Sequence, residues 1–471
     1  MSTTTANMTT ANKSSKQPSG QSSMAAKREE YLKHLLTQSA KAAKASGLGL
    51  ETLRERAIAL TSERSFPSNK DEEWRFTDLS EMLGLPFQVS AAKETSEETS
   101  EDALDALKSK LIVLEDSYRL VTVNGHYMPE LSVAGRDVVA PELPDGAMIG
   151  PLSELLSHPT DGDLVKATLT DKIAQIQGNG EVFTALNTTG FSDVMVVWIR
   201  SDQTINAPIH IARVATGEGV SHLRTLVIAE RHAKFTLVET FCSDDDQTRF
   251  NNNVSELWLS EGAQVTHARL QDEGEQTFHI SKTAISQAEN STYHSTSIDL
   301  GGRLARHHHE MYQAGPQTET HLYGLSALGD SQLADTHSLI ALTHPHSRAT
   351  QVQKNVVDDR AHSVFNGKVY VSQAAQHTDA AQLNRNLMIS DKARVDTKPE
   401  LDIVADNVKC AHGATVSQLQ ADEVFYLQSR GISATQAQRL LLYGFAMEIV
   451  EKISVSSLRQ RLSDRISKWA R

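Results

Sequence analysis

Hydrophobic positions follow three successive patterns along the chain. From Lys27 to about Ser65 the leucines and alanines recur at helical spacing, and from about Val182 to Thr415 apolar residues alternate with polar ones. After Gln418 the spacing is helical again. A period of 3.6 residues is typical of amphipathic helices, and a period of two is typical of half-buried strands. The pattern therefore predicts a helical beginning, a long all-β centre and a helical end.

The first region is predicted to combine helices with a few strands. A break at residues 47–49, which contains two glycines, divides two helical segments, and the acidic, polar stretch from Ser90 to Asp105 is typical of a solvated loop. A strand from Leu120 to Val123 precedes Asn124-Gly125, a dipeptide typical of tight hairpin turns. We therefore expect a mixed α/β region before the long β region.

The central region contains short segments rich in branched and aromatic residues, such as Val194 to Ile199 and Phe235 to Phe241. Turn-forming pairs such as Glu289-Asn290 and Gly329-Asp330 separate them at irregular intervals, and we expect no helix among them. The periodicity is compatible with a β-sandwich or a parallel β-helix. A β-helix would explain the many polar strand residues if they occupied the solvated face of each rung.

The last region is predicted to form three helices. A short helix from Asp422 to Ser429 ends before Gly431, and Ser433 with Gln436 three residues later has the arrangement of a capping box. The run from Ala437 to Val450 is apolar on nearly every face, so its own protein or a partner must cover it on more than one side. The final segment has an ordinary amphipathic pattern. The predicted divisions are a disordered tail over 1–26, an N-terminal mixed helical region over 27–175, a β core over 176–417 and a C-terminal helical region over 418–471.

Composition narrows the possible functions. The formal net charge is -13 and no basic stripe is present, which excludes the electrostatic footprint of a nucleic-acid binder. The longest apolar run, Leu440 to Val450, is about half of the roughly 20 residues that a membrane-spanning helix needs, so we expect a soluble protein. Two cysteines, Cys242 and Cys410, fit a reducing, cytoplasmic compartment. The Ser- and Thr-rich tail would instead be a transit peptide if the protein works in the plastid stroma.

Several stretches carry a family resemblance. Residues 69–79 read NKDEEWRFTDL, residues 360–368 read RAHSVFNGK, residues 376–387 contain QHTDAAQ and NRNL, and residues 409–415 read KCAHGAT. The first string resembles the N-terminal signature of the SufD family, and the others resemble the core and C-terminal end shared by SufB and SufD proteins. SufB proteins are expected to carry several cysteines, one of them in the segment that here spans 384–390, and this segment has none. The resemblance therefore favours SufD, over about Lys27 to Ile453.

The resemblance implies a mainly β fold, with a right-handed parallel β-helix core between an N-terminal helical (mixed α/β) region and a C-terminal helical region. It also implies a non-catalytic scaffold of the SUF iron-sulfur cluster assembly machinery. Such a subunit pairs with SufB through the β-helix, or with a second copy of itself when SufB is absent. Its C-terminal helices bind the ATPase SufC, and it has no P-loop sequence of its own for ATP hydrolysis.

Cys410 and His412 are the candidate metal ligands. Their spacing of two places both side chains on one face of a strand, and thiolate and imidazole both suit iron. From the residues alone, a structural role and a metal-binding role are both open. The resemblance favours the second, with a nascent cluster of iron and sulfide shared with SufB and no cofactor held stably by the chain alone. We expect His412 to contribute first and Cys410 second.

The C-terminal helices carry the candidate partner-binding residues. By resemblance these residues contact SufC, although plain helix packing is the alternative that the pattern itself allows. They are Arg430, Gly431, Ile432, Gly444, Phe445 and Glu448.

Two other functions fit parts of the sequence. Asp358, Asp359 and Arg360 would form an acid-base cluster in a β-helix carbohydrate-active enzyme, although aromatic residues for stacking sugars are only 5% of the chain. Histidines are frequent between His279 and His412, which suits a stand-alone histidine-rich metal-binding protein. On a strand, however, the middle residue of the triplet 307–309 faces away from the other two, so the triplet is not a preformed three-ligand site.

Overall fold

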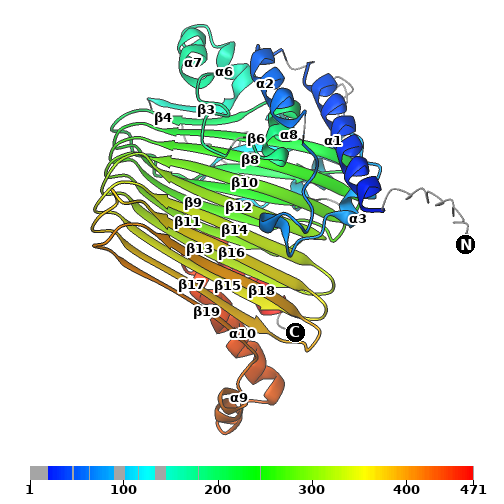
Figure 1. Cartoon of the computed structure of the whole chain (residues 1–471), viewed down its shortest axis with the longest axis vertical. Helices are drawn as coiled ribbons and strands as arrows, with labels where there is room; N and C mark the ends of the chain where they lie inside the picture. Colours follow the sequence, from blue (N-terminus) through cyan, green and yellow to red (C-terminus); the bar gives the residue numbers. More distant parts are fainter. Residues whose placement is uncertain are drawn as a thin grey trace, which may run out of the picture.

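The computed structural model describes the chain except for residues 1–19, 45–46, 63, 90–100, 115, 133–144, 179, 244–245 and 470–471. Its centre is a parallel β-helix built from a ten-stranded sheet and a nine-stranded sheet (Figure 1). From β4 onwards, each strand pairs with the strand two places later in the chain, so the chain alternates between the sheets. This topology confirms the predicted parallel β-helix and excludes a β-sandwich.

The ten-stranded sheet has the order β19-β17-β15-β13-β11-β9-β7-β5-β1-β2. Its strands are β1 (Tyr118–Val123), β2 (His126–Tyr127), β5 (Ile209–Ala215), β7 (Lys234–Ser243), β9 (Gln264–Asp272), β11 (Thr292–Asp299), β13 (Glu319–Leu328), β15 (Arg348–Val357), β17 (Asp379–Met388) and β19 (Lys409–Ser417). The predicted hairpin joins β1 to β2, and both Asn124 and Gly125 have the positive φ that such a turn requires.

The nine-stranded sheet has the order β18-β16-β14-β12-β10-β8-β6-β4-β3. Its strands are β3 (Ala147–Pro151), β4 (Met195–Ile199), β6 (Gly219–Ala229), β8 (Arg249–Leu259), β10 (Thr277–Gln287), β12 (Leu304–Gln313), β14 (Leu333–Leu342), β16 (His362–Val371) and β18 (Arg394–Ile403). From β4 onwards, register partners are between 26 residues apart, as Phe278 and Leu304 are, and 32 residues apart, as His362 and Arg394 are.

In seven successive rungs, one turn uses a residue in the left-handed conformation, and these residues form a column along one side of the β-helix. In each, the backbone N–H donates to a carbonyl of the next rung, as from His346 to Gln376 at 3.0 Å and from His377 to Asn407 at 2.8 Å. Gly, Asn, Asp and His adopt this conformation more readily than most residues. The column consists of Asp202, His232, Gly262, Asn290, Gln317, His346 and His377.

The space between the two sheets, which we call the lumen, has an apolar part and a polar part. Val227, Ile285 and Val369 belong to one continuous apolar cluster that follows the lumen from rung to rung. The polar part contains buried ion pairs, such as Arg269 with Asp299 at 2.6 Å. The prediction that polar strand residues lie on the solvated face was therefore wrong for these side chains, because ion pairs and hydrogen bonds satisfy them inside.

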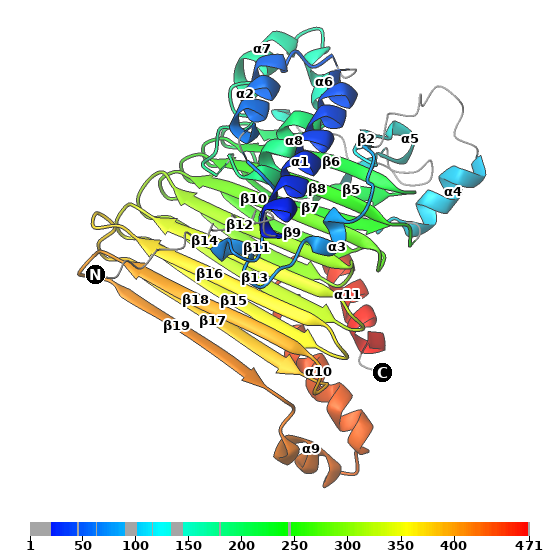
Figure 2. The ribbon, with the colours of Figure 1, turned by 45° about the vertical axis from the view of Figure 1, so that its right-hand side comes forward.

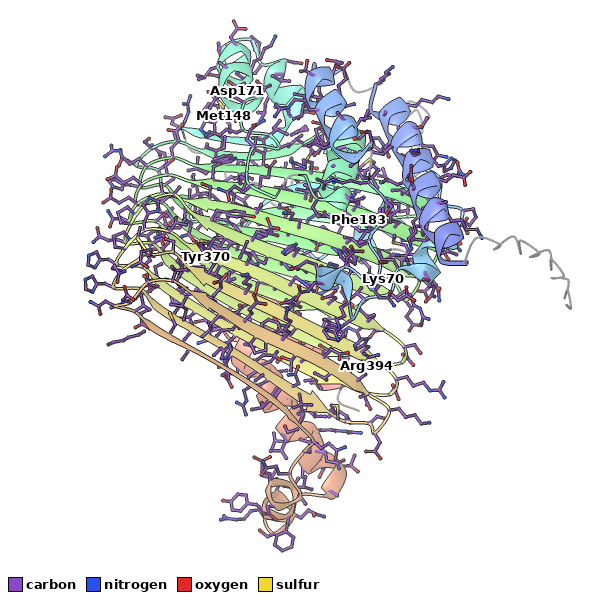
Figure 3. The ribbon with its side chains drawn as sticks, in the orientation of Figure 1. Lys70, Met148, Asp171, Phe183, Tyr370 and Arg394 are labelled. Atoms are coloured by element: carbon purple, nitrogen blue, oxygen red, sulfur yellow. The ribbon has the colours of Figure 1, made fainter. Side chains whose placement is uncertain are left out.

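Three of the N-terminal helices cover the outer face of the nine-stranded sheet. Helices α1 (Gly20–Lys44) and α2 (Glu51–Thr61) pack on α8 (Val182–Gly190), which lies against the strands. Phe183 of α8 fills the centre of this layer, with its ring centroid 5.1 Å from that of Phe66 and 6.0 Å from that of Phe250 (Figure 3). The predicted tail included residues 20–26, which are the start of α1; its residues 1–19 lie outside the described residues.

The signature at residues 69–79 docks on the same sheet. Trp74, in the 3-10 helix η1 (Glu72–Trp74), is buried, and the Arg306 guanidinium lies 3.8 Å from its ring centroid. Arg306 in turn pairs with Asp335, and Thr77 donates a hydrogen bond to the same carboxylate. The signature therefore acts as an anchor, in which a cation–π contact and a buried ion pair tie the N-terminal region to the β-helix.

Two predicted segments have a different structure. All nine residues of α8 are buried, so the helix has no exposed face, and the prediction that the β region begins at about Val182 was wrong for this segment. Glu181 caps it by accepting hydrogen bonds from the backbone of Phe183 and Thr184. Most of the predicted loop, residues 90–100, lies outside the described residues. Its last part, residues 101–105, is the beginning of a helix. The remaining N-terminal helices are α3 (Ser80–Leu83), α4 (Glu101–Lys110), α5 (Pro129–Ser132), α6 (Leu152–Leu156) and α7 (Gly162–Leu169).

Three C-terminal helices follow β19: α9 (Ala421–Gln428), α10 (Ala434–Val450) and α11 (Ser456–Trp469). Ser433 and Gln436 form the predicted capping box. The second half of α10 and the apolar stripe of α11 pack on the ten-stranded sheet, while α9 and the first half of α10 project beyond the β-helix (Figure 2). Across the described residues, every helix is too short or too polar to cross a membrane.

Candidate functional site at the open end of the β-helix

The two ends of the β-helix differ. At the beginning, the short strands β2 and β3 pair antiparallel with β1 and β4, and α6 and α7 follow β3 (Figure 1). At the other end, β18 and β19 are the outermost strands of their sheets. No residue of β18 or β19 is fully buried, although alternate residues of β17 are. A rung with unpaired edges calls for a cap or a partner.

Cys410 and His412 lie on this last rung. In register they follow Ala380 and Gln382 of β17, whose side chains are buried inside the β-helix. Residues that match in register share a face, so the Cys410 and His412 side chains also face the lumen. Cys410 is half-buried against the apolar cluster and His412 is exposed. The structure thus places both predicted ligands at the lumen opening, on one face of one strand.

The imidazole is the better donor of the two. Burial raises the pKa of the Cys410 thiol, and the nearby Asp379 carboxylate raises it further, although the backbone of Ala380 has an opposite effect. The thiol is therefore protonated at neutral pH, whereas metals bind the thiolate. One imidazole and one hindered thiol can supply at most two ligands, so a metal centre here would need further ligands from another molecule.

Beneath the last rung, the lumen is lined by amides and a hydroxyl. Thr397 of β18 donates to Asn384 across the lumen at 2.7 Å, and Asn386 donates to the same oxygen at 2.6 Å. None of these three residues was among the site residues predicted from the sequence. Asn384 and Asn386 lie in register with Ala414 and Val416, which follow His412 on β19, and this relation can be used only once the rung length is known.

The outer face of β18 carries alternating charges. Lys398 pairs with Glu72 at 2.6 Å, and Lys368 pairs with Glu400 at 3.1 Å. Hydrogen bonding to Lys368 lowers the pKa of Glu400 despite an opposing effect of partial burial, and the bond to Glu72 raises the pKa of Lys398. Charged side chains on an edge strand oppose unspecific strand pairing, so this edge favours a selected partner.

The projecting C-terminal helices expose a second candidate surface. Phe425 and Tyr426 of α9 are 70% and 58% exposed, and Leu440 of α10 is 51% exposed. Arg430 donates to the Tyr426 hydroxyl at 3.2 Å, and Gly431 adopts the left-handed conformation that turns the chain into α10. Clustered exposed aromatic residues mark an interaction surface. Of the predicted residues, Arg430 and Gly431 are exposed here and Ile432 is half-buried.

The other predicted partner-binding residues lie where α10 meets the β-helix. The buried Lys354 ammonium donates to the Phe445 carbonyl at 3.0 Å, pairs with Glu448, and lies 4.3 Å from the Phe445 ring centroid. Burial lowers the pKa of Lys354, against the opposing effect of Glu448. Phe445 and Glu448 therefore anchor α10 to β15, whereas Gly444 has open space at its α-carbon.

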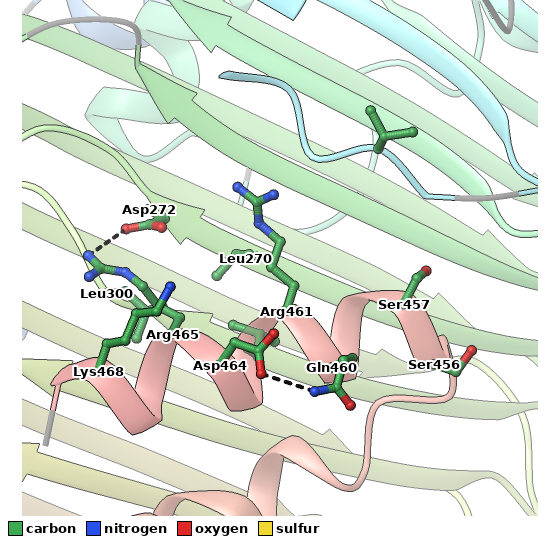
Figure 4. A pocket seen from close by; sticks show the side chains of 12 residues that line it. Leu270, Asp272, Leu300, Ser456, Ser457, Gln460, Arg461, Asp464, Arg465 and Lys468 are labelled. Carbon is green, nitrogen blue, oxygen red and sulfur yellow. Dashed lines mark hydrogen bonds and ion pairs between the residues drawn. The ribbon is translucent and has the colours of Figure 1, made fainter. Parts of the chain in front are cut away.

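A shallow groove of about 860 Å³ lies between α11 and the ten-stranded sheet (Figure 4). Arg465 pairs with Asp272 at 3.5 Å, and Gln460 donates to Asp464 at 3.0 Å. None of the predicted site residues lines this groove.

The histidine triplet is split between two environments. His307 and His309 face the lumen with their ring centroids 5.2 Å apart, and His308 lies on the other side near Glu310. This confirms the predicted alternation. Burial lowers the pKa of His309 to about 3, so this ring is neutral, and Thr283 and Ser297 hydrogen-bond the His307 ring. Hydrogen bonding and burial thus account for both lumen imidazoles.

The remaining candidates have structural surroundings. Cys242 is buried, as expected for a small apolar side chain. Asp358 accepts a hydrogen bond from the backbone of Asp359, and Asp359 accepts one from the backbone of Asp330 in the adjacent turn. These carboxylates therefore stabilise turns between rungs.

Two models of known protein families together match nearly the whole described chain. The model of the SufBD protein N-terminal region matches residues 25–211. The model described as SUF system FeS cluster assembly, SufBD core domain, matches residues 212–445. The second match contains both predicted ligands and most of α10.

Individual relatives agree with these matches. An iron-sulfur cluster assembly SufBD family protein of Synechocystis is 41% identical over 427 residues, which is 88% of this chain and 90% of the relative. The iron-sulfur cluster assembly protein SufD of Escherichia coli is 30% identical over 85% of this chain and 88% of its own length. The chloroplastic protein ABCI7 of Arabidopsis thaliana is 30% identical over 92% of this chain and 88% of its own length.

Proposed function

The chain belongs to the SufBD family of the SUF iron-sulfur cluster assembly system, and from this premise we propose that it is a scaffold subunit of the SufD type. In this proposal it pairs with SufB through its open last rung and binds the ATPase SufC through its projecting helices. It performs no catalytic step of its own. The nascent cluster, iron and sulfide, is cargo that SufB and this chain hold together.

The observation that carries the proposal is the unpaired last rung with His412 at its opening. Two sheet edges, β18 and β19, end there together, so a second β-helix could continue both sheets by hydrogen bonding along its own edges. Iron-sulfur clusters are usually held by several thiolates. Since Cys410 is protonated at neutral pH, this chain would supply His412 as its main ligand, Cys410 as a lesser one, and SufB would supply the rest.

The projecting helices suit the ATPase. Exposed Phe425, Tyr426 and Leu440 would enter a groove of SufC, with Arg430 and Gly431 at the turn between α9 and α10. The other end of α10 is fixed to β15 through Lys354. A shift of α10 during the ATPase cycle would thus reach β15, and β17 connects β15 to β19. This connection would let nucleotide state alter the shared cluster site.

Two further points belong to the proposal. A second copy of this chain could use the same edge when SufB is absent, which would give a homodimer without a complete ligand set. The cytoplasm is the proposed compartment, or the plastid stroma in a plastid-bearing source; the chloroplastic relative suits the second option.

Anaerobic co-purification tests the proposal. The chain is expressed with and without SufB and SufC, and co-elution, iron and sulfide are measured. We expect a three-component complex in which His412→Ala lowers cluster loading at least about tenfold without loss of subunits. His377→Ala, which removes another imidazole near the same end, is the control and should load normally.

Other outcomes of this experiment would refute the proposal. Failure of the chain to bind either protein would refute the scaffold function, as would full loading of the His412→Ala complex. Iron bound by the isolated chain independently of His412 and Cys410 would indicate a histidine-rich metal-binding protein. A monomer that cleaves polysaccharides would indicate a carbohydrate-active enzyme.

A further inference from the structure

Three side chains form a line inside the lumen that ends at His412. Gln351 of β15 lies in register with Gln382 of β17, and Gln382 lies in register with His412 of β19. Neighbouring strands are about 4.8 Å apart, so each of these side chains is within hydrogen-bonding reach of the next. Gln351 and Gln382 are buried, at 4% and 3% exposure.

The hydrogen bonds along this line have a direction. Ser338 and Gln351 are bonded to each other, and the Gln382 amide nitrogen donates to the Gln351 oxygen at 2.9 Å. The Gln382 carbonyl oxygen is buried and has no hydrogen-bond partner. The oxygen and nitrogen of an amide diverge from its carbon, so the nitrogen that bonds Gln351 leaves the oxygen able to accept from a donor on the next rung.

The lumen is shaped to admit this amide. Across from Gln382, on β16, stands Gly367, where a β-carbon would lie 2.3 Å from the Gln382 amide nitrogen and 2.6 Å from the Phe365 ring. Any larger residue at position 367 would therefore displace Gln382. A buried oxygen without a partner is destabilising unless a donor reaches it, and the donor next in line is the His412 ring.

We propose that Gln382 is a positioning residue that accepts a hydrogen bond from one ring N–H of His412 and so directs the other ring nitrogen out of the lumen as a ligand. The inference rests on the proposed function, because it assigns His412 as a ligand. A metal-bound imidazole nearly always donates its second N–H to an oxygen acceptor, which fixes its tautomer and orientation. Gln382 supplies that acceptor before any partner arrives.

The test observes His412 directly. The full chain is labelled with ¹⁵N-histidine, the His412 ring signals are assigned by their loss in His412→Gln, and spectra are recorded at about pH 8.5, where free imidazole is neutral. We expect one protonated and one unprotonated ring nitrogen in the wild type. Gln382→Leu should move both signals toward the tautomer average, and Gln382→Glu, which keeps an oxygen acceptor, should preserve the single tautomer.

The control is Gln353→Leu, which removes an equally buried glutamine that bonds Asn355 and lies two residues along β15 from Gln351. It should leave the His412 signals unchanged. In the complex with SufB and SufC, Gln382→Leu should weaken ferrous iron binding about 10- to 100-fold.

The positioning role of Gln382 and the proposed function of the chain can be refuted separately. Unchanged His412 signals in Gln382→Leu, or a change as large in Gln353→Leu, would overturn the positioning role even if His412→Ala abolishes cluster loading. Full loading of the His412→Ala complex would overturn the proposed function itself, whatever the tautomer is.

Discussion

The anchor between Lys354 and α10 can be tested with Lys354→Met, which keeps the length of the side chain but removes its charge and its donor. The Lys354 side chain is 1% exposed, so the contacts that it loses are shielded from water. The wild-type ammonium donates to the Phe445 carbonyl at 3.0 Å and contacts the Phe445 ring.

The expected magnitude follows from these contacts. A hydrogen bond from a charged donor contributes about 1.5–3 kcal/mol, and the cation–π contact about 0.5–2 kcal/mol. The pair with Glu448 adds little, because the Glu448 side chain is 55% exposed and remains hydrated without its partner. Relief of the desolvation that lowers the pKa of Lys354 offsets part of the loss. We expect the free energy for local opening of α10 to fall by about 2 kcal/mol.

Native-state hydrogen exchange measures this change. A loss of about 2 kcal/mol raises exchange in the second half of α10 about 30-fold, while amides of the neighbouring strands keep their rates. The control is Lys368→Met, which removes a lysine that is 39% exposed and pairs with Glu400 and Asp402 at the surface. Equal exchange of α10 in the two variants would refute the anchor, as would uniform acceleration throughout the chain.

Three more predictions follow from buried groups. Burial raises the pKa of Glu239 and Glu273, but it is outweighed by hydrogen bonds and nearby positive charge, mainly from His267 and Arg213 at Glu239 and from His279 at Glu273, and both pKa values fall to about 2. The stabilisation from these carboxylates is therefore complete above the unfolded pKa of about 4.3 and is lost as pH falls toward 2. Urea unfolding should show this loss, and a flat profile would contradict it. Alkylation of Cys410 in the isolated chain should become fast only above the ordinary thiol pKa of about 8.5; rapid reaction at neutral pH would contradict the protonated thiol. Trp74→Ala should cost about 3–5 kcal/mol and detach the N-terminal region first in limited proteolysis, whereas uniform cleavage would argue against an anchor.

Sequence patterns predicted an element correctly where that element depends on residues that are close together in the chain. The hairpin at Asn124-Gly125 and the capping box at Ser433 were predicted correctly, because each depends on side chains within a few residues. Period two identified the strands, but it did not distinguish a β-helix from a sandwich. Only the family resemblance separated them, since pairing between rungs joins residues 26 to 32 positions apart.

The failures also have physical causes. Helix α8 is buried on all sides, and polar residues such as Asn187 make hydrogen bonds inside the protein, so no exposed polar face distinguishes it from the buried strands that follow. Polar strand residues such as Arg269 were expected outside, because a single sequence does not show that Asp299 lies on the next rung to pair with it. The same limit concealed Gln382. The sequence predicted that Cys410 and His412 share a face of a strand. It did not predict that this face lies at the open end of the lumen.

The unequal ends of the β-helix limit how many molecules can associate. One end has short antiparallel strands and helices beside it, and the other presents two free edges, β18 and β19. If both ends were free, head-to-tail stacking would repeat and produce filaments. If association uses only the end formed by β18 and β19, as in the proposed function, growth stops once two β-helices have met, and the shape of the chain then sets the stoichiometry.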